Sequence, residues 1–402
     1  MKYHEKNLHC VYPFKEPQKC YGKLNKSFEE VKNWLISSGL FVSDNNSKHY
    51  GAVYSFFDEQ SNDYSFLYPE ITGYFISTMK FLHSLESDDQ YSKYAKSSSD
   101  WLISIYEKYN SLVQGIKNDS PTSNLSYSFD TAICAKGLLD YYELSNDEKY
   151  LSYAKIMIDD LINQFIESDG SVIPFKDITT NTPTQDGSVW YKQKGCLHIK
   201  TAMPFFQISQ YVDEPNFLKI GKNICDSISK YQNSDGSIRL HENSKIINLH
   251  TLSYALEGLV YGYNFTRDEK YLTVIKNSLD WCLNQISNDG SIQLWHNSKY
   301  HSKAAYPIAQ LIRILVLFNS GEKNAHYKSK VEILYNFLIS LQASHDSTKI
   351  NGGFYEEYYK SFLGWKKRLR INSWTSMFAL QAIYWYENIN SIKFSEQIKF
   401  LY

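Results

Sequence analysis

Residues 68–74 read Tyr-Pro-Glu-Ile-Thr-Gly-Tyr and open an apolar run that continues to Leu82. Proline is favoured in the first turn of an α-helix, because the N–H that it lacks would have no partner there. A carboxylate in the same turn, here Glu70, faces the positive end of the helix dipole. This stretch therefore predicts a helix that begins at Pro69 and carries an acid in its first turn.

The same arrangement, a polar residue at the start of an apolar helix-like run, recurs about every 50 to 70 residues. Each run is followed by a polar turn and a second helix-like run. The further openings are Ser128-Phe129-Asp130-Thr131-Ala132, His198-Ile199-Lys200-Thr201-Ala202, His250-Thr251-Leu252-Ser253-Tyr254-Ala255-Leu256-Glu257, His301-Ser302-Lys303-Ala304-Ala305 and Asn372-Ser373-Trp374-Thr375-Ser376. A repeat of this length indicates helical hairpins that stack side by side and bury one another.

Two further patterns support a ring of such hairpins. Three of the second helices run into an Asp-Gly-Ser turn, at 169–171, 235–237 and 289–291, where glycine can take the positive φ that ends a helix. The first helices are rich in small residues, which suits an inner ring that is packed on both sides. They include Ala132, Ala135, Gly137, Ala202, Ala255, Gly258, Ala304, Ala305 and Ala309.

We therefore predict an all-α fold, an (α/α)6 toroid of six helical hairpins in a single domain. The toroid would occupy residues 28–402, with a first helix at 28–40, and a polar N-terminal strap would occupy residues 1–27. A helical solenoid that does not close is the alternative.

The composition limits the classes of partner. The chain has 402 residues, 43% of them apolar and 21% charged, which is ordinary for a globular protein with a sizeable core. Its formal net charge of -1 provides no overall field for nucleic acid or an anionic surface. Aromatic residues reach 16%, with 34 Tyr, which suits the faces of sugar rings but also fits an AT-rich codon bias.

The start of the chain lacks the apolar core of a signal peptide, and no run approaches the length of a membrane span. Six cysteines form no Cys-x-x-Cys pair, which favours free thiols in a reducing cytoplasm. We expect a cytoplasmic protein with no membrane span.

Nothing in the sequence requires a metal or a cofactor. His4, His9, Cys10 and Cys20 have a spacing that matches no familiar zinc site. Phosphate-loop, dinucleotide, metalloprotease and nucleophile-elbow motifs are absent, so we expect no nucleotide-dependent transfer, dinucleotide redox chemistry or serine hydrolysis of known layout.

Three motifs carry a resemblance to a known family. They are Tyr-Pro-Glu-Ile-Thr-Gly-Tyr at 68–74, Phe-Asp-Thr-Ala at 129–132 and His-Thr-x-x-Tyr-Ala-Leu-Glu-Gly-Leu at 250–259. In this order they resemble the polysaccharide-biosynthesis family typified by VpsJ and, more broadly, the six-hairpin glycosidase-type toroids. The resemblance covers roughly residues 60–390, and it implies a pathway more firmly than a reaction.

The Asp-Gly-Ser turns also resemble degenerate Gln-x-x-Asp-Gly-x-Trp repeats of triterpene cyclases. The most similar copy is 232–238, in which Ile238 replaces the final Trp. The Asp-x-Asp-Asp acid motif of those enzymes is absent, which indicates a shared toroid rather than a shared chemistry.

In a closed toroid the inner helices share one direction, so their starts converge on one mouth. We expect the catalytic residues there to be Glu70, Asp130, His198 and His250. The expected substrate-binding residues are Lys200, Asp186, Trp190, Glu257, Trp295, His301, Lys303, Glu356 and Trp374, with the basic run 366–370 beside them. Asp186 would be a second acid over the mouth, on the long loop 169–197.

Each of these residues also has a purely structural interpretation. Glu70 could only stabilise its helix end, by about 0.3–1 kcal/mol, and Asp130 could be an N-cap. His250 and Glu257 lie two turns apart on one helix face and could couple, or Glu257 could be hydrogen-bonded within the inner ring. The tryptophans could belong to the core, and the basic run could be a solvated loop.

The sequence favours a cytoplasmic carbohydrate-active enzyme that acts on a cell-surface or capsular polysaccharide or its precursor. Cleavage of a glycosidic bond needs one acid and one carboxylate base or nucleophile, which Glu70 and Asp130 would supply. A sugar epimerase or lyase with His250 or His198 as its base is the first alternative. A non-catalytic glycan-binding or scaffold protein of polysaccharide assembly is the second.

Overall fold

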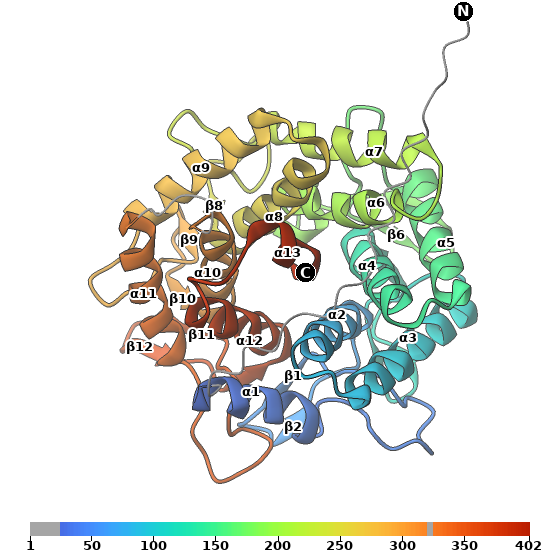
Figure 1. The fold of residues 1–402 in the computed structure, drawn as a ribbon, viewed down its shortest axis with the longest axis horizontal. Coiled ribbons are helices and arrows are strands. Elements are labelled where there is room, and N and C mark those ends of the chain that lie inside the picture. Colours follow the sequence, from blue (N-terminus) through green and yellow to red (C-terminus); the bar gives the residue numbers. More distant parts are fainter. Residues whose placement is uncertain (1–24, 320–324) are drawn as a thin grey trace, which may run out of the picture.

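The computed structural model describes residues 25–319 and 325–402, and Figure 1 shows two concentric rings of helices. The inner ring consists of α2 (Pro69–Glu86), α4 (Ser128–Ser145), η2 (Cys196–Ala202) continued by α6 (Met203–Ile208), α8 (Leu249–Thr266), α10 (Ala305–Asn319) and α12 (Ser373–Glu387). The outer ring consists of α3 (Asp89–Tyr109), α5 (Glu148–Gln164), α7 (Pro215–Asp226), α9 (Glu269–Asn284), α11 (Ala325–Ile339) and α1 (Lys26–Ser37). The predicted (α/α)6 toroid is confirmed.

Helix α12 closes the ring, because it packs between α10 and α2 and is covered from outside by α1. The first described helix is thus the outer partner of the last inner one, and Phe28 of α1 lies 5.8 Å from the ring of Tyr384. The alternative of an open solenoid is wrong. Residues 1–24 of the predicted strap and the histidines and cysteines considered for zinc lie outside the described residues, while Lys26 and Ser27 belong to α1.

The repeated polar turn joins the inner and outer helix of a hairpin. Ser87, Asn146 and Arg267 each take a left-handed conformation that ends the inner helix. The aspartate that follows each of them caps the outer helix by accepting a hydrogen bond from a backbone N–H two residues later. One local signal therefore both stops one helix and starts the next.

The third inner helix differs from the prediction, because its first half is a 3₁₀ helix, η2. Pro204 lacks an N–H and cannot bond to the carbonyl of Lys200 four residues earlier. The backbone N–H of Met203 bonds to that carbonyl instead, across three residues. Gly258 of α8 lies against this segment so closely that a Cβ there would come within 2.3 Å of the carbonyl oxygen of Ile199.

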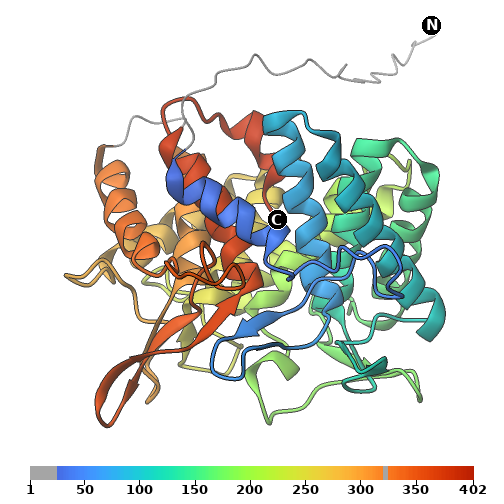
Figure 2. The same cartoon turned by 90° about the horizontal axis from the view of Figure 1, so that it is seen from below.

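Short strands were not predicted, and they gather at the end of the toroid where the inner helices begin (Figure 2). They are β1 (Phe56–Asp58), β2 (Asp63–Tyr64), β3 (Ile116–Lys117), β4 (Ser120–Pro121), β5 (Leu125–Tyr127), β6 (Phe175–Asp177), β7 (Thr182–Thr184), β8 (Ile247–Asn248), β9 (Trp295–His296), β10 (Ser302–Ala304), β11 (Glu357–Ser361), β12 (Gly364–Lys367) and β13 (Arg370–Asn372). All their pairings are antiparallel. Strands β5, β8, β10 and β13 lead directly into α4, α8, α10 and α12, so this end of the toroid is the predicted mouth.

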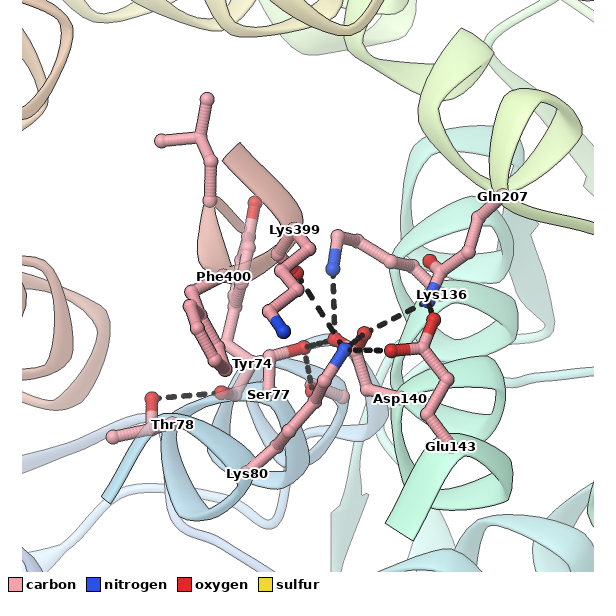
Figure 3. A network of polar contacts seen from close by, with 12 residues as sticks. Tyr74, Ser77, Thr78, Lys80, Lys136, Asp140, Glu143, Gln207, Lys399 and Phe400 are labelled. Carbon is pink, nitrogen blue, oxygen red and sulfur yellow. Dashed lines mark hydrogen bonds and ion pairs between the residues drawn. The ribbon is translucent and has the colours of Figure 1, made fainter. Parts of the chain in front are cut away.

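A network of buried charges lies further along the inner helices (Figure 3). Asp140 of α4 accepts hydrogen bonds from Lys80 and Lys136, both at 2.7 Å, from Ser77 at 2.6 Å and from Gln207 at 2.9 Å. The two lysines hold the pKa of Asp140 well below its usual value, although burial alone would raise it. Lys80 is ten residues after Glu70, or about 15 Å along α2, so the network lies away from the mouth.

The last described residues fill the axis of the ring beside this network. They include α13 (Phe394–Gln397) and η4 (Ile398–Phe400). The hydroxyl of Tyr402, which is fully buried, donates to the carbonyl of Met377 at 2.9 Å, and the carbonyl of Leu401 accepts from Tyr261 at 3.1 Å. The C-terminal residues therefore occupy the centre of the toroid at this level, and Figure 1 shows α13 and the end of the chain inside the inner ring.

Substitution of Asp140 tests how much the buried charge network contributes to the stability of the protein. We expect Asp140→Asn to lower the free energy of unfolding by about 3–5 kcal/mol, because it leaves Lys136 buried without its carboxylate. Urea unfolding of both proteins would measure the loss. Lys393→Ala is the control, since it breaks the exposed ion pair with Glu396 and should cost at most about 1 kcal/mol. Equal effects of the two substitutions would contradict this account.

The Asp-Gly-Ser turns supply a second test. Gly236 has φ of +90°, as predicted for these glycines, and a Cβ there would lie 2.4 Å from the carbonyl oxygen of Asn277 on α9. Gly236→Ala should cost at least about 1–2 kcal/mol from the left-handed conformation alone, and more from the backbone clash. Thermal unfolding should show a lower midpoint than in the control Gly187→Ala, whose new methyl group meets no atom within 4 Å.

Candidate active site

Glu70 and Asp130 lie together at the mouth because α2 and α4 pack in close contact. A Cβ on Gly137 would come within 2.8 Å of the carbonyl oxygen of Gly73, so the two backbones nearly touch. Both carboxylates are buried, with 8% of Glu70 and 4% of Asp130 exposed. Tyr68 interacts with both of them.

The N-cap interpretation of Asp130 is wrong. The N-cap position of α4 is Tyr127, whose side chain makes no capping hydrogen bond, and Asp130 is the third residue of the helix. Its Oδ2 atom has no hydrogen-bond partner among residues 25–319 and 325–402. A buried carboxylate oxygen without a partner costs free energy, which is typical of a group that meets its partner in a ligand.

Burial raises the pKa of Glu70 to about 7, although Tyr68 and the charge of Lys200 both lower it. Burial also holds the pKa of Asp130 well above its usual value, and repulsion from Glu70 adds to this. Two carboxylates that repel each other cannot both ionise easily. Near neutral pH the pair therefore retains a proton.

A second buried group stands beside the pair and centres on Glu257, which is fully buried. Glu257 accepts hydrogen bonds from Lys200 at 2.7 Å, from Gln310 at 3.1 Å and from Arg313. The amide oxygen of Gln310 lies 2.7 Å from Nδ1 of His250. His250 and Glu257 are thus coupled through Gln310 rather than directly.

This contact determines which nitrogen of His250 carries the proton. Because the amide oxygen of Gln310 can only accept, Nδ1 donates and Nε2 holds the free lone pair. Burial lowers the pKa of His250 to about 3, and the nearby charges of Lys200 and Arg313 lower it further, so the ring is neutral.

Aromatic rings connect the two groups. The ring of Tyr254 lies 4.1 Å from that of His250 and 4.8 Å from that of Phe129, the neighbour of Asp130. The ammonium of Lys200 lies 4.5 Å from the ring of Tyr254. Burial raises the pKa of Tyr254, and the charge of Glu70 raises it further, so Tyr254 lies near the carboxylate pair.

The other predicted catalytic histidine is also buried and neutral. His198 lies on η2, and its Nε2 atom is 3.3 Å from the carbonyl oxygen of Gln193. Its Nδ1 atom is buried and has no hydrogen-bond partner within the described ranges. Burial lowers the pKa of His198 to about 4. No contact links it to the carboxylate pair, so its catalytic role stays a prediction.

Half-buried aromatic side chains surround the mouth. The rings of Trp190 and Trp295 lie 6.4 Å apart, and Trp374 lies 6.3 Å from Tyr306, which in turn contacts His250 at 4.5 Å. Such rings offer flat apolar faces with a polar edge. Substrate contacts by the three tryptophans stay predictions.

The remaining predicted residues lie on loops and strands outside the inner helices. Burial, with repulsion from Glu357, raises the pKa of Glu356 to about 7. Asp186 is half-exposed on its loop and bonds to Ser188, while Lys303 is paired with Asp289 on an Asp-Gly-Ser turn. His301 is exposed. The structure joins none of these to Glu70 and Asp130 by a described contact.

Several residues at the site were not predicted from the sequence. They are Tyr68, Tyr254, Tyr306, Gln310 and Arg313. A signal was present for the last two, since they interrupt the otherwise apolar run of α10, and polar side chains in a helix that is buried all round need buried partners.

Two surface hollows lie elsewhere, one of about 240 Å³ beside β1 and β2 and one of about 420 Å³ beside α3. In the described ranges, no cluster of three or more His, Cys, Asp or Glu side chains could hold a metal ion. None of the described helices is both long and apolar enough to cross a membrane.

No protein-family profile and no curated protein matches this sequence. Solved structures do match it. Cellobiose 2-epimerase from Bacillus thermoamylovorans is 12% identical, with a TM-score of 0.72 over 89% of this chain and 98% of the enzyme. A D-mannose isomerase is 12% identical, with a TM-score of 0.72 over 92% of this chain and 99% of the enzyme.

An unsaturated glucuronyl hydrolase specific for heparin is 13% identical, with a TM-score of 0.67 over 92% of this chain and 98% of the enzyme. The fold is that of the (α/α)6 toroid enzymes. At these identities the similarity concerns the fold, and the chemistry of this chain has to come from its own side chains.

The carboxylate pair predicts an unusual titration. We expect the side-chain carboxyl carbon of Glu70, followed by 13C NMR and assigned with Glu70→Gln, to titrate near pH 7 rather than near its ordinary 4.5. Since the folded-state pKa is raised, the folded protein binds more protons than the unfolded chain between these values. Its free energy of unfolding should therefore fall as the pH rises from about 4.5 to about 7.

Glu70→Gln should lack this part of the pH dependence, because glutamine stays neutral. A Glu70 carboxyl that titrates near 4.5, or a variant with the same pH dependence as the wild type, would contradict the description of the pair.

Proposed function

We propose that this protein is a glycosidase-like hydrolase that cleaves a glycosidic bond in a cell-surface or capsular polysaccharide or its precursor. The observation that carries the proposal is the buried pair Glu70 and Asp130, which retains a proton near neutral pH. The resemblance of the motifs at 68–74, 129–132 and 250–259 to the VpsJ-like family supports a place in polysaccharide biosynthesis, in the cytoplasm. Solved neighbours that are named as sugar enzymes add support by analogy of fold.

The two carboxyl groups would have different roles. Asp130, whose pKa is raised by burial and by Glu70 and which has no cation beside it, keeps its proton and donates it to the glycosidic oxygen as that bond breaks. Glu70, beside the positive charge of Lys200, is the more easily ionised. It acts as the base that takes a proton from the attacking water, or as the nucleophile that attacks the anomeric carbon.

The buried cations support this division of roles. Lys200 is held by Glu257, and its ammonium faces the ring of Tyr254 rather than solvent. Its charge favours the ionised form of Glu70 without a direct salt bridge. Because both groups are buried, where the effective dielectric constant is low, this fixed charge acts strongly on Glu70.

The test is to delete the gene in its host and to complement it with wild type, Glu70→Gln, Asp130→Asn or the control Asp213→Asn. Asp213 is an exposed loop residue outside the site. We expect the control to restore the surface glycan, and both site variants to leave the deletion phenotype, by mass spectrometry and NMR. On the glycan so identified, the purified variants should be slower by about 10²–10⁴-fold.

Circular dichroism should show that all variants are folded. If Glu70→Gln and Asp130→Asn both restore the glycan, the hydrolase proposal fails, and a non-catalytic glycan-binding or scaffold role takes its place.

A sugar epimerase or lyase is the second candidate, and the geometry of His250 favours it. Gln310 holds the ring so that Nε2 carries a free lone pair, as a base that removes a proton from carbon requires. Reaction in D2O separates the two candidates. Deuterium bound to carbon in the product supports epimerisation with His250 as the base, whereas hydrolysis introduces none.

A further inference from the structure

The antiparallel hairpin of β11 and β12 displays two large apolar side chains at its tip. Ser361 pairs with Gly364, so the turn between the strands consists of Phe362 and Leu363. Phe362 is 94% exposed and Leu363 is 71% exposed. Side chains of this size are seldom left so open to water unless they meet a partner.

Local hydrogen bonds hold this turn in shape. The hydroxyl of Ser361 donates to the carbonyl of Gly364 at 2.9 Å and accepts from the N–H of Leu363 at 3.2 Å. Gly364 takes a φ of +105°, which suits glycine. The apolar tip is therefore presented by a defined turn.

The outer part of the hairpin is purely basic. Residues 359–367 contain three lysines and no acidic residue. Lys360 and Lys366 are exposed on opposite strands, and Lys360 lies next to the loop of the exposed Tyr300 through a backbone bond to His301. The acids at the base of the hairpin are engaged by Arg368, which lies 2.8 Å from Glu357.

The hairpin also projects beyond the mouth end of the toroid, as Figure 2 shows in red at the lower left. Trp365, which is exposed beside the tip, is the aromatic residue type that prefers a membrane–water interface. The turn consists of two residues, whereas a stable protein interface takes about 800 Å² and 20 or more residues from each partner. Binding to a bilayer requires only that the tip of the hairpin inserts into it.

We propose that this hairpin docks the protein on the surface of an anionic phospholipid membrane. Phe362 and Leu363 enter the boundary between headgroups and acyl chains, and Trp365 lies at the level of the headgroups. Lys360 and Lys366 face the lipid phosphates and carboxylates. The formal net charge of -1 does not oppose this, since the attraction is local and decays within a Debye length.

Docking in this way turns the mouth, with Glu70 and Asp130, toward the bilayer. If the proposed hydrolase activity holds, its substrate would be a saccharide attached to the membrane. The docking itself does not depend on that activity.

The test is co-sedimentation of the full chain with vesicles of phosphatidylcholine, with and without phosphatidylserine. We expect binding to the vesicles that contain phosphatidylserine, and weaker binding as salt is added. The double variant Phe362→Ser, Leu363→Ser should bind at least about tenfold less, and Lys360→Ala with Lys366→Ala should lose most of the preference for phosphatidylserine.

Ile156→Ser is the matched control, because Ile156 is an apolar side chain on α5 that is 45% exposed, and it should bind as the wild type does. Glu70→Gln should also bind normally, which separates docking from catalysis. No wild-type binding to either vesicle, or undiminished binding by the tip variant, would overturn the proposal. Light scattering that shows a dimer in the wild type and a monomer in the tip variant would overturn it too, in favour of a second copy of the chain.

Discussion

Ring closure by α12 is the constraint on which the rest of this structure depends. Because α12 packs between α10 and α2, every inner helix has neighbours on both sides and an outer helix behind it. Because the neighbouring helices shield them from solvent, polar side chains on the inner helices must form hydrogen bonds across the ring or remain without a partner. The same closure points all six inner-helix starts toward one end.

The two aspartates of α4 show how position along the ring axis decides the charge of a group. Asp140 meets two lysines, so its pKa is lowered and it holds three inner helices together through Ser77, Lys80 and Gln207. Asp130, ten residues earlier, meets another carboxylate and no cation, so its pKa is raised. The residue type, the helix and the degree of burial are shared, and the neighbours alone differ.

Burying two carboxyl groups side by side, as with Glu70 and Asp130, lowers the free energy of unfolding. The toroid tolerates this because many other contacts hold the surrounding helices in place. Lys200, Glu257, Gln310 and Arg313 form a hydrogen-bonded array beside the pair, and removing one member of such an array is costly. The array fixes the orientation of His250 and the field around Glu70. Buried ionisable groups whose pKa values are shifted by burial and by a charged neighbour are typical of sites where chemistry takes place.

By itself the sequence determined the repeat, the helix starts at Pro69 and Ser128, and the glycine turns, because hydrophobic periodicity and turn chemistry act over a few residues. It also indicated Glu70 and Asp130 as candidate catalytic residues, since an acid in the first turn of a helix is a local feature of the sequence. Only the tertiary structure decided that Asp130 meets another carboxylate while Asp140 meets two lysines, that Gln310 joins His250 to Glu257, and that residues 357–367 project as a basic hairpin with an apolar tip. These properties depend on contacts between helices and strands that are 50 or more residues apart in the sequence. Patterns over a few residues do not predict such contacts.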